Sequence, residues 1–146
     1  MPVWSPALEV GHPAIDEQHR ELCRRIRGLR EAMQQRRTST EMGTLVTYLH
    51  RYCREHFEIE EQVMAEHGFP GAAAHHAQHV AFERRLGAYE SSFGEKGPSA
   101  RVVLELKDFL QDWWVEHVEG PDQDLGAHLA AERKATLSAA PARAAR

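Results

Sequence analysis

The chain has 146 residues, a length that suits one ordinary domain and is short for two. Its 42% hydrophobic and 27% charged residues are typical of a soluble folded protein, and a formal net charge of −4 gives no general attraction to nucleic acid or membrane. No stretch approaches the roughly 18 apolar residues of a membrane span, and the N-terminus lacks the segments of a signal peptide. We therefore expect a cytoplasmic protein.

The two cysteines, Cys23 and Cys53, lie inside helical patterns and form no CxxC arrangement. This spacing predicts neither a disulfide framework nor a thiolate zinc site. Because free cysteine behaves as a small hydrophobic residue, we expect both side chains to be buried and reduced.

The first helical pattern covers about residues 14–37 and follows an irregular N-terminal arm, residues 1–13, in which Trp4 is the expected anchor. Apolar residues recur at helical spacing along this segment, and His19 occupies a position on the same stripe. The stripe is predicted to contain Ile15, Leu22, Ile26, Leu29 and Met33.

Three further helical patterns follow, at about residues 40–66, 72–93 and from 99 onward. "HGFPG" at 67–71 and "GEKGPS" at 94–99 supply the glycine and proline residues that end helices and form turns. "VEGPDQD" interrupts the fourth pattern, whose stripe includes Val102, Leu106, Phe109 and Trp113. A short amphipathic helix is expected at about 122–137, and residues 138–146 are expected to be a flexible tail.

Four amphipathic segments of roughly 20 residues joined by short turns predict an all-α fold, an up-down-up-down four-helix bundle. We expect residues 1–137 to form one domain, with the arm packed across the bundle.

Histidine occupies the apolar stripe of every predicted helix of the bundle. A single histidine there is usually a satisfied core or boundary residue, but this chain has five, and the second helix adds a carboxylate. Burying so many polar groups without partners would cost about 1 to 3 kcal/mol each, which could exceed the stability of such a domain. A metal centre would compensate them. The residues are His19, His56, Glu60, His75, His79 and His117.

The spacing supports ligation. His56 and Glu60 are four residues apart, as are His75 and His79, so each pair shares a helix face. His76 is turned about 100° from His75 and is predicted to be a bystander. A carboxylate partner for His117 is also needed. We favour Asp122 over the nearby acidic residues because the glycine and proline before it permit a local distortion.

Five histidines and two carboxylates exceed the ligands of one ion but suit two ions bridged by the carboxylates. With one hydroxide bridge, the ion held by three histidines is six-coordinate and the other is five-coordinate, which leaves one position open. Apolar residues near the ligands would form a pocket for a small neutral molecule there. They are Leu22, Trp113, Trp114 and Val118.

Four motifs carry a resemblance to the hemerythrin family, specifically its single-domain bacterial members. They are "IDEQHREL", "HFEIEE", "HHAQHVAF" and "DWWVEHVEGPD", and the match extends over about residues 4–125. Two departures accompany it. Trp114 stands where family members commonly have leucine, which would narrow the pocket, and "EGP" precedes Asp122 and affects where this carboxylate lies.

The resemblance implies a non-haem di-iron centre with an oxo or hydroxo bridge that binds dioxygen reversibly for oxygen storage or transport. It implies that Glu60 and Asp122 bridge the two irons, and that dioxygen binds end-on to the five-coordinate iron and rests there as a hydroperoxide. The six-coordinate iron would be held by His75, His79 and His117, and the five-coordinate iron by His19 and His56.

Two other functions stay open. A di-iron enzyme with oxidase, peroxidase or nitric-oxide activity is disfavoured because ferritin-like sites use ExxH pairs, and the only such pair here is Glu9 with His12. A sensing module would need a signalling partner, and a protein partner for oxygen delivery or signalling is left open. The remaining histidines are expected to be ordinary surface residues: His12, His50, His67 and His128.

Overall fold

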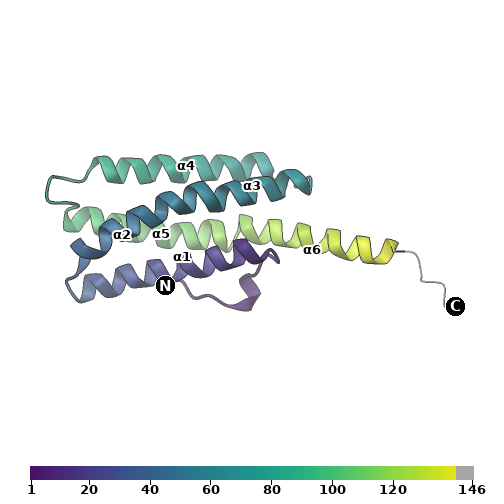
Figure 1. Ribbon diagram of the computed structural model, residues 1–146, viewed down its shortest axis with the longest axis horizontal. Helices are drawn as coiled ribbons and strands as arrows, with labels where there is room; N and C mark the ends of the chain where they lie inside the picture. Colours follow the sequence, from purple (N-terminus) through teal and green to yellow (C-terminus); the bar gives the residue numbers. More distant parts are fainter. Residues whose placement is uncertain (141–146) are drawn as a thin grey trace.

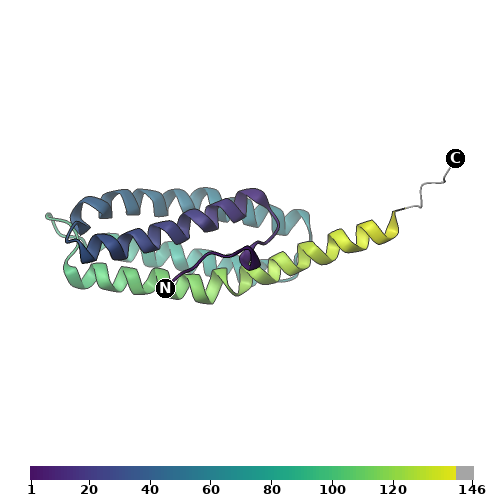
Figure 2. The same cartoon turned by 90° about the horizontal axis from the view of Figure 1, so that it is seen from below.

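The computed structural model describes residues 1–140, and within them the chain is helical, with no strand. Four antiparallel helical rods lie side by side (Figures 1 and 2), which confirms the predicted all-α bundle. The first rod is α1 (Pro13–Gln34) and the third is α4 (Ala72–Ser91). The second consists of α2 (Thr38–Arg51), η2 (Tyr52–His56) and α3 (Phe57–Glu66), and the fourth of α5 (Ala100–Trp113), η3 (Trp114–Val118) and α6 (Pro121–Ala139).

The helix boundaries follow from local chemistry. Pro13 and Pro121 begin α1 and α6, where a missing N–H costs nothing because the first turn has no acceptor for it. The side chain of Ser99 caps α5 by accepting a hydrogen bond from the Val102 N–H. After α3, Gly68 adopts a positive φ of 57°, a conformation in which glycine carries no steric penalty.

The second and fourth rods each contain one π-helical turn, η2 and η3, where the sequence pattern predicts an uninterrupted helix. A π-turn holds one more residue than an α-turn, so it changes the direction of the side chains that follow while the rod continues. The hydrophobic period cannot detect such a slip of one residue. Each π-turn contains one of the stripe histidines, His56 in η2 and His117 in η3.

The apolar core forms two clusters separated by a polar layer. The larger cluster fills the half of the bundle around Leu49, Leu106 and Leu110, and the smaller one surrounds Ile15 and Leu125 where the arm meets α6. In the first rod, His19 lies between a residue of the smaller cluster and Leu22 of the larger one. The other stripe histidines occupy the same level in their own rods.

Two residues of the predicted stripes are half-buried rather than buried, although Met33 still packs against the larger cluster. The structure buries Ala32 and leaves Met33 half-buried, and it buries Val103 while Val102 is half-buried. Both positions lie near the end of the bundle where the first and fourth rods reach their loops, and there neighbouring positions share the boundary between core and solvent.

The N-terminal arm crosses the bundle beside α1. The Asp16 carboxylate accepts hydrogen bonds from the backbone N–H groups of Val10 (2.7 Å) and Gly11 (3.2 Å), which fixes the bend where the arm enters the helix. The half-buried Trp4 packs on the larger cluster, and the guanidinium of Arg20 lies 5.0 Å from its ring centroid.

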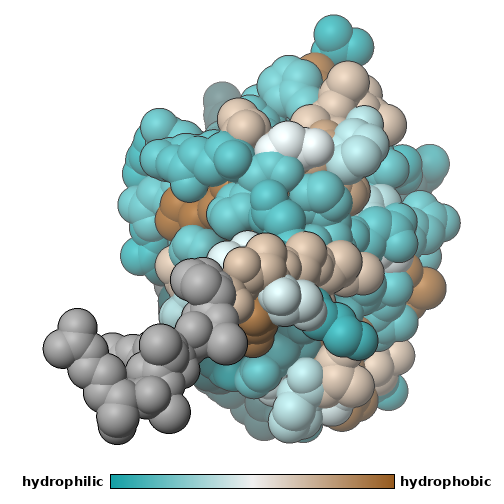
Figure 3. Space-filling view, turned by 90° about the vertical axis from the view of Figure 1, so that its right-hand side faces the viewer, coloured by the Kyte–Doolittle hydropathy of each residue, from teal (hydrophilic) through white to brown (hydrophobic). Residues whose placement is uncertain are grey.

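The last helix is longer than the short helix predicted for residues 122–137. It runs from Pro121 to Ala139 and projects past the end of the bundle (Figure 1), where residues 130–140 are exposed. The sequence analysis assigns Ser138 and Ala139 to a flexible tail; both are helical in the structure, and residues 141–146 lie outside the described part. From this end the surface is mostly hydrophilic (Figure 3). Within residues 1–140, no helix combines the length and apolar character that a membrane crossing requires.

Candidate metal centre

The polar layer contains all seven residues that the sequence singles out as ligands, brought together from four rods. Each of them is at most 2% exposed. His75 and His79 come from α4, while Glu60 and Asp122 come from α3 and α6. The set is His19, His56, Glu60, His75, His79, His117 and Asp122.

Glu60 divides its two oxygens between two groups of histidines. Its Oε1 lies 3.3 Å from Nε2 of His56 and 3.8 Å from Nε2 of His19. Its Oε2 lies 3.1 Å from Nε2 of His75 and 3.0 Å from Nε2 of His79. One carboxylate thus faces histidines of the first and second rods on one side and histidines of the third rod on the other.

Asp122 repeats this division from the opposite side of the layer. Its Oδ2 lies 3.0 Å from Nε2 of His19. Its Oδ1 lies 3.1 Å from Nε2 of His75 and 3.0 Å from Nε2 of His117. Each carboxylate therefore presents one oxygen to each of two neighbouring groups of histidines.

Two overlapping sets of four side chains could each hold one ion, because in each set the ligand atoms lie within 4.8 Å of one another. Glu60 belongs to both sets, and Asp122 belongs to the second while its other oxygen faces the first. The first set is Glu60, His75, His79 and His117, and the second is His19, His56, Glu60 and Asp122.

The polar atoms that face the centre of the layer are better placed to bind a metal than to form hydrogen bonds with one another. Nε2 of His56, His79 and His117 has no hydrogen-bond partner among the described residues, and neither does Glu60 Oε1. These atoms lie close to oppositely charged or polar groups without forming aligned hydrogen bonds. Since each unsatisfied buried polar group costs about 1 to 3 kcal/mol, a metal bound by neutral imidazole and carboxylate would satisfy the whole set at once.

Some of these groups favour the protonation state that binds a metal, whereas the raised pKa values of His19 and His75 favour protonated rings beside the two carboxylates. Burial raises the pKa of Glu60, but the surrounding histidines outweigh it and hold that pKa well below its ordinary value, so the carboxylate stays ionised. Burial lowers the pKa of His56 and of His117, which favours neutral rings. Burial also disfavours charge on His75, yet the Asp122 and Glu60 carboxylates raise its pKa to about 9. A metal would take the place of that proton.

The segment between His117 and Asp122 shows how the last carboxylate reaches the layer. Glu119 N–H donates to the carbonyl of Trp114 across the π-turn, and α6 then begins at Pro121. Gly120 is needed between them, because a Cβ at this position would lie 2.9 Å from the carbonyl oxygen of Glu116. The distortion expected from the glycine and proline is therefore present, and it directs Asp122 inward.

Three of the histidines have their outer nitrogen fixed by a hydrogen-bond acceptor that the sequence analysis did not identify. Nδ1 of His56 lies 2.8 Å from Oε1 of Gln18, and Nδ1 of His117 lies 2.6 Å from Oε1 of Gln78. Nδ1 of His79 lies 2.9 Å from Oε1 of Glu61. An Nδ1–H that donates to these oxygens leaves the Nε2 lone pair directed at the centre. Each acceptor adjoins a ligand in the sequence, but its own partner lies on another rod.

Aromatic rings stack against the same three histidines. Tyr52 lies on His56, with ring centroids 4.5 Å apart and an interplanar angle of 15°. Phe57 lies on His79 at 3.9 Å and 6°, and Trp113 lies on His117 at 3.8 Å and 12°. This stacking completes the orientation of the rings and excludes water from this side of the layer.

The four residues predicted to line a ligand pocket are all buried in the larger cluster. Trp113 stacks on His117, and Trp114 is fully buried with its indole N–H donating to Glu119 Oε1 at 2.7 Å. A further aromatic residue, Trp4, lies on the side of the polar layer that contains His19. The centroids of the two rings are 6.4 Å apart. The sequence identified Trp4 only as an anchor of the arm.

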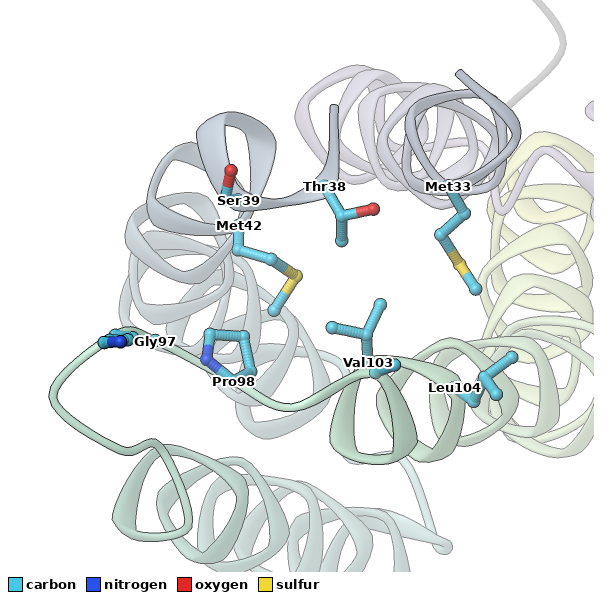
Figure 4. A pocket seen from close by; sticks show the side chains of 10 residues that line it. Met33, Thr38, Ser39, Met42, Gly97, Pro98, Val103 and Leu104 are labelled. Carbon is cyan, nitrogen blue, oxygen red and sulfur yellow. The ribbon is translucent and has the colours of Figure 1, made fainter. Parts of the chain in front are cut away.

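An apolar hollow of about 410 Å³ lies at the far end of the bundle, between the α1–α2 turn and the loop before α5. The side chains of Met33, Met42 and Val103 converge on it (Figure 4). It is lined by none of the seven candidate ligand residues, so nothing connects it with the metal centre.

The other histidines lie outside the polar layer. His76 is 58% exposed and contacts Glu61 rather than the ligands, as expected for a non-ligand. His50 and His67 are exposed and lie beside glutamates. His12 and His128 are half-buried, which makes them less exposed than the surface positions that the sequence analysis predicts for them.

Comparison with known proteins gives a consistent family. A family model described as "Hemerythrin HHE cation binding domain" matches residues 10–129. The chain is 31% identical over 131 residues to a Bacteriohemerythrin of Stenotrophomonas maltophilia (strain R551-3), which covers 87% of this chain and 83% of that protein. A Bacteriohemerythrin of Pseudomonas aeruginosa (strain LESB58) is 32% identical over 120 residues (82% and 76%), and a Myohemerythrin of Theromyzon tessulatum is 25% identical over 119 residues (82% and 86%). The chain belongs to the hemerythrin family.

Proposed function

We propose that this protein binds two iron ions in the polar layer and uses them to bind dioxygen reversibly, as an oxygen store or carrier. The observation that supports this most strongly is the division of Glu60 and Asp122, each of which presents one oxygen to each histidine group. One ion would be held by His75, His79 and His117 and the other by His19 and His56, with the carboxylates and an oxo or hydroxo group as bridges.

Iron is the metal we propose because the donors are imidazole and carboxylate and because the family relationship points to it. When bound, the pair of ions would supply redox electrons for dioxygen and one open coordination position. The position would be open because only two histidines would hold one of the ions, whereas three would hold the other. Apart from these two histidines, the set of four around that ion contains only the carboxylates of Glu60 and Asp122.

The protein's own residues would keep this position apolar and hold the ligands still. Leu22 is completely buried next to the layer, and Trp4 covers the His19 side. A neutral diatomic molecule can enter such surroundings, whereas a larger polar substrate would find nothing to orient it. Gln18 fixes the His56 ring, so the ligand geometry is set before any ligand enters.

The enzyme alternative is disfavoured by the position of the one ExxH pair. Glu9 is exposed and forms an ion pair with Arg20 at 2.9 Å, so it takes no part in the centre. The centre is rich in histidine and has only two carboxylates, unlike the carboxylate-rich sites of ferritin-like enzymes.

The experiment is to load the metal-free protein with ferrous iron, determine the iron content and record the visible spectrum during cycles of air and argon. We expect about two irons per chain and a charge-transfer band that forms in air and disappears under argon. Steady consumption of peroxide or nitric oxide would support the enzyme alternative instead. A chain that binds no iron would refute the proposal.

A further inference from the structure

The three acceptors that hold the outer nitrogens of the histidines differ in charge. Gln18 and Gln78 offer neutral amide oxygens to His56 and His117. Glu61 offers a carboxylate to His79, and it is the one charged acceptor among the three. The two proposed ion positions are therefore surrounded unequally, although their bridging carboxylates are shared.

Glu61 is held in place from outside by His76. Its Oε1 lies 2.8 Å from Nδ1 of His76 and 2.9 Å from Nδ1 of His79, so one oxygen accepts hydrogen bonds from both rings. His79 is 2% exposed, whereas the side chains of Glu61 and His76 are 35% and 58% exposed. The contacts from His79 through Glu61 to His76 therefore connect a buried candidate ligand with the protein surface. Glu61 and His76 are not themselves candidate ligands.

A carboxylate acceptor changes its histidine more than an amide does. A hydrogen bond to a charged acceptor is roughly twice as strong as a neutral one, and it draws the Nδ1 proton away from the ring. The ring then becomes a stronger base at Nε2, the atom that faces the metal. Stronger donation stabilises the ferric ion more than the ferrous ion, because the ferric ion carries the higher charge.

We propose that Glu61 is a positioning residue that acts through His79 to lower the reduction potential of the iron held by the three histidines, and that His76 keeps Glu61 in place. The inference rests on the proposed di-iron function. The step concerned is the gain of one electron by a ferric ion to become ferrous, with dithionite as the electron donor in the experiment. No proton or covalent bond of Glu61 is consumed.

The test is a potentiometric titration of the iron-loaded protein and three variants, with the iron content of each determined first. Glu61→Gln should raise one of the two reduction potentials. We expect the ratio of ferric to ferrous affinity to fall tenfold, which corresponds to a shift of about 59 mV for one electron. Gln78→Glu should lower the same potential because His117 serves the same ion, and Gln18→Glu should lower the other potential. A merely structural role would weaken iron binding without this pattern of signs.

Two further measurements separate the possible failures. In metal-free protein, the nitrogen NMR signal of His79 Nδ1–H should shift in Glu61→Gln, and His76→Ala should shift it less in the same direction. An unchanged His79 signal, or unchanged potentials in Glu61→Gln at full iron content, would overturn the inference. An unchanged signal in His76→Ala would overturn the role of His76. If wild-type protein binds no iron, the proposed function fails, while the His79 signal still decides whether Glu61 acts on that ring.

Discussion

Nε2 of His117 lies 3.0 Å from Oδ1 of Asp122, although the two residues are five positions apart in the chain. In an uninterrupted α-helix, residues at this separation point about 140° apart. The π-turn that contains His117 and the non-helical Gly120 remove that difference. The position of this buried carboxylate thus depends on a break in a helix.

Replacing this carboxylate should remove one bridge while the fold persists. Asp122→Asn leaves an amide that cannot act as a charged bridge, so we expect the iron content to fall from about two to one or fewer per chain. Asp124→Asn is the matched control, because Asp124 is exposed in the same first turn of α6. Iron analysis after gel filtration measures both. Two irons retained in Asp122→Asn would contradict the assignment of this bridge.

The break itself can be tested through its glycine. In Gly120→Ala the new Cβ would lie 2.9 Å from the Glu116 carbonyl oxygen, so the backbone must shift and carry Asp122 with it. We expect a loss of about 1 to 3 kcal/mol in the free energy of unfolding and weaker iron binding. In α4, Gly87 has nothing within 4 Å of an added Cβ. Gly87→Ala should therefore stabilise the helix by up to about 1 kcal/mol in the same urea titration. Equal effects of the two changes would refute this account.

The three neighbouring histidines of α4 should separate by function. We expect His75→Ala and His79→Ala to lose iron, because each removes a buried donor. His76→Ala should keep about two irons, since this ring is 58% exposed and its Nδ1 lies 2.8 Å from the carboxylate of Glu61. Circular dichroism checks that each variant is folded, and iron analysis gives the result. Iron loss in His76→Ala equal to that in the other two would contradict the assignment of His76 as a non-ligand.

Cys53 should make the protein lose stability in alkali. Burial raises the pKa of its thiol from 9.0 to about 12, so the folded chain keeps this proton where the unfolded chain releases it. Stability from this group is therefore complete below pH 9 and declines as the pH rises from 9 toward 12. Relative to Cys53→Ala, wild-type protein should lose about 1 kcal/mol by pH 10. Urea titrations at several pH values measure the difference, and parallel curves for the two proteins would contradict it.

The residues that the sequence identified well are those whose signal lies within one helix. His75 and His79 sit four residues apart on a stripe that also carries Phe82, and this spacing already places them on the buried face. The same periodicity predicted the helical bundle. It could not reveal η2 or η3, because an added residue in a turn alters direction without interrupting the hydrophobic pattern.

Contacts between side chains of different rods could not be predicted from the spacing of residues along the sequence. Gln78 directly precedes His79, yet its oxygen accepts from His117 on another rod. Trp4 lies 15 positions before His19, in an arm without periodicity, and only the fold brings their rings near each other. Such partners depend on how the rods are placed side by side, which no single helix pattern specifies.

The measurement that tests the central claim most directly is an oxygen titration of the iron-loaded, fully reduced protein, followed by the visible spectrum and by dissolved oxygen. Our account predicts that one dioxygen binds for every two irons and that argon removes the band and returns the oxygen, through repeated cycles. An oxidised spectrum that argon never reverses, or oxygen uptake with no bound oxygen returned, would contradict reversible binding.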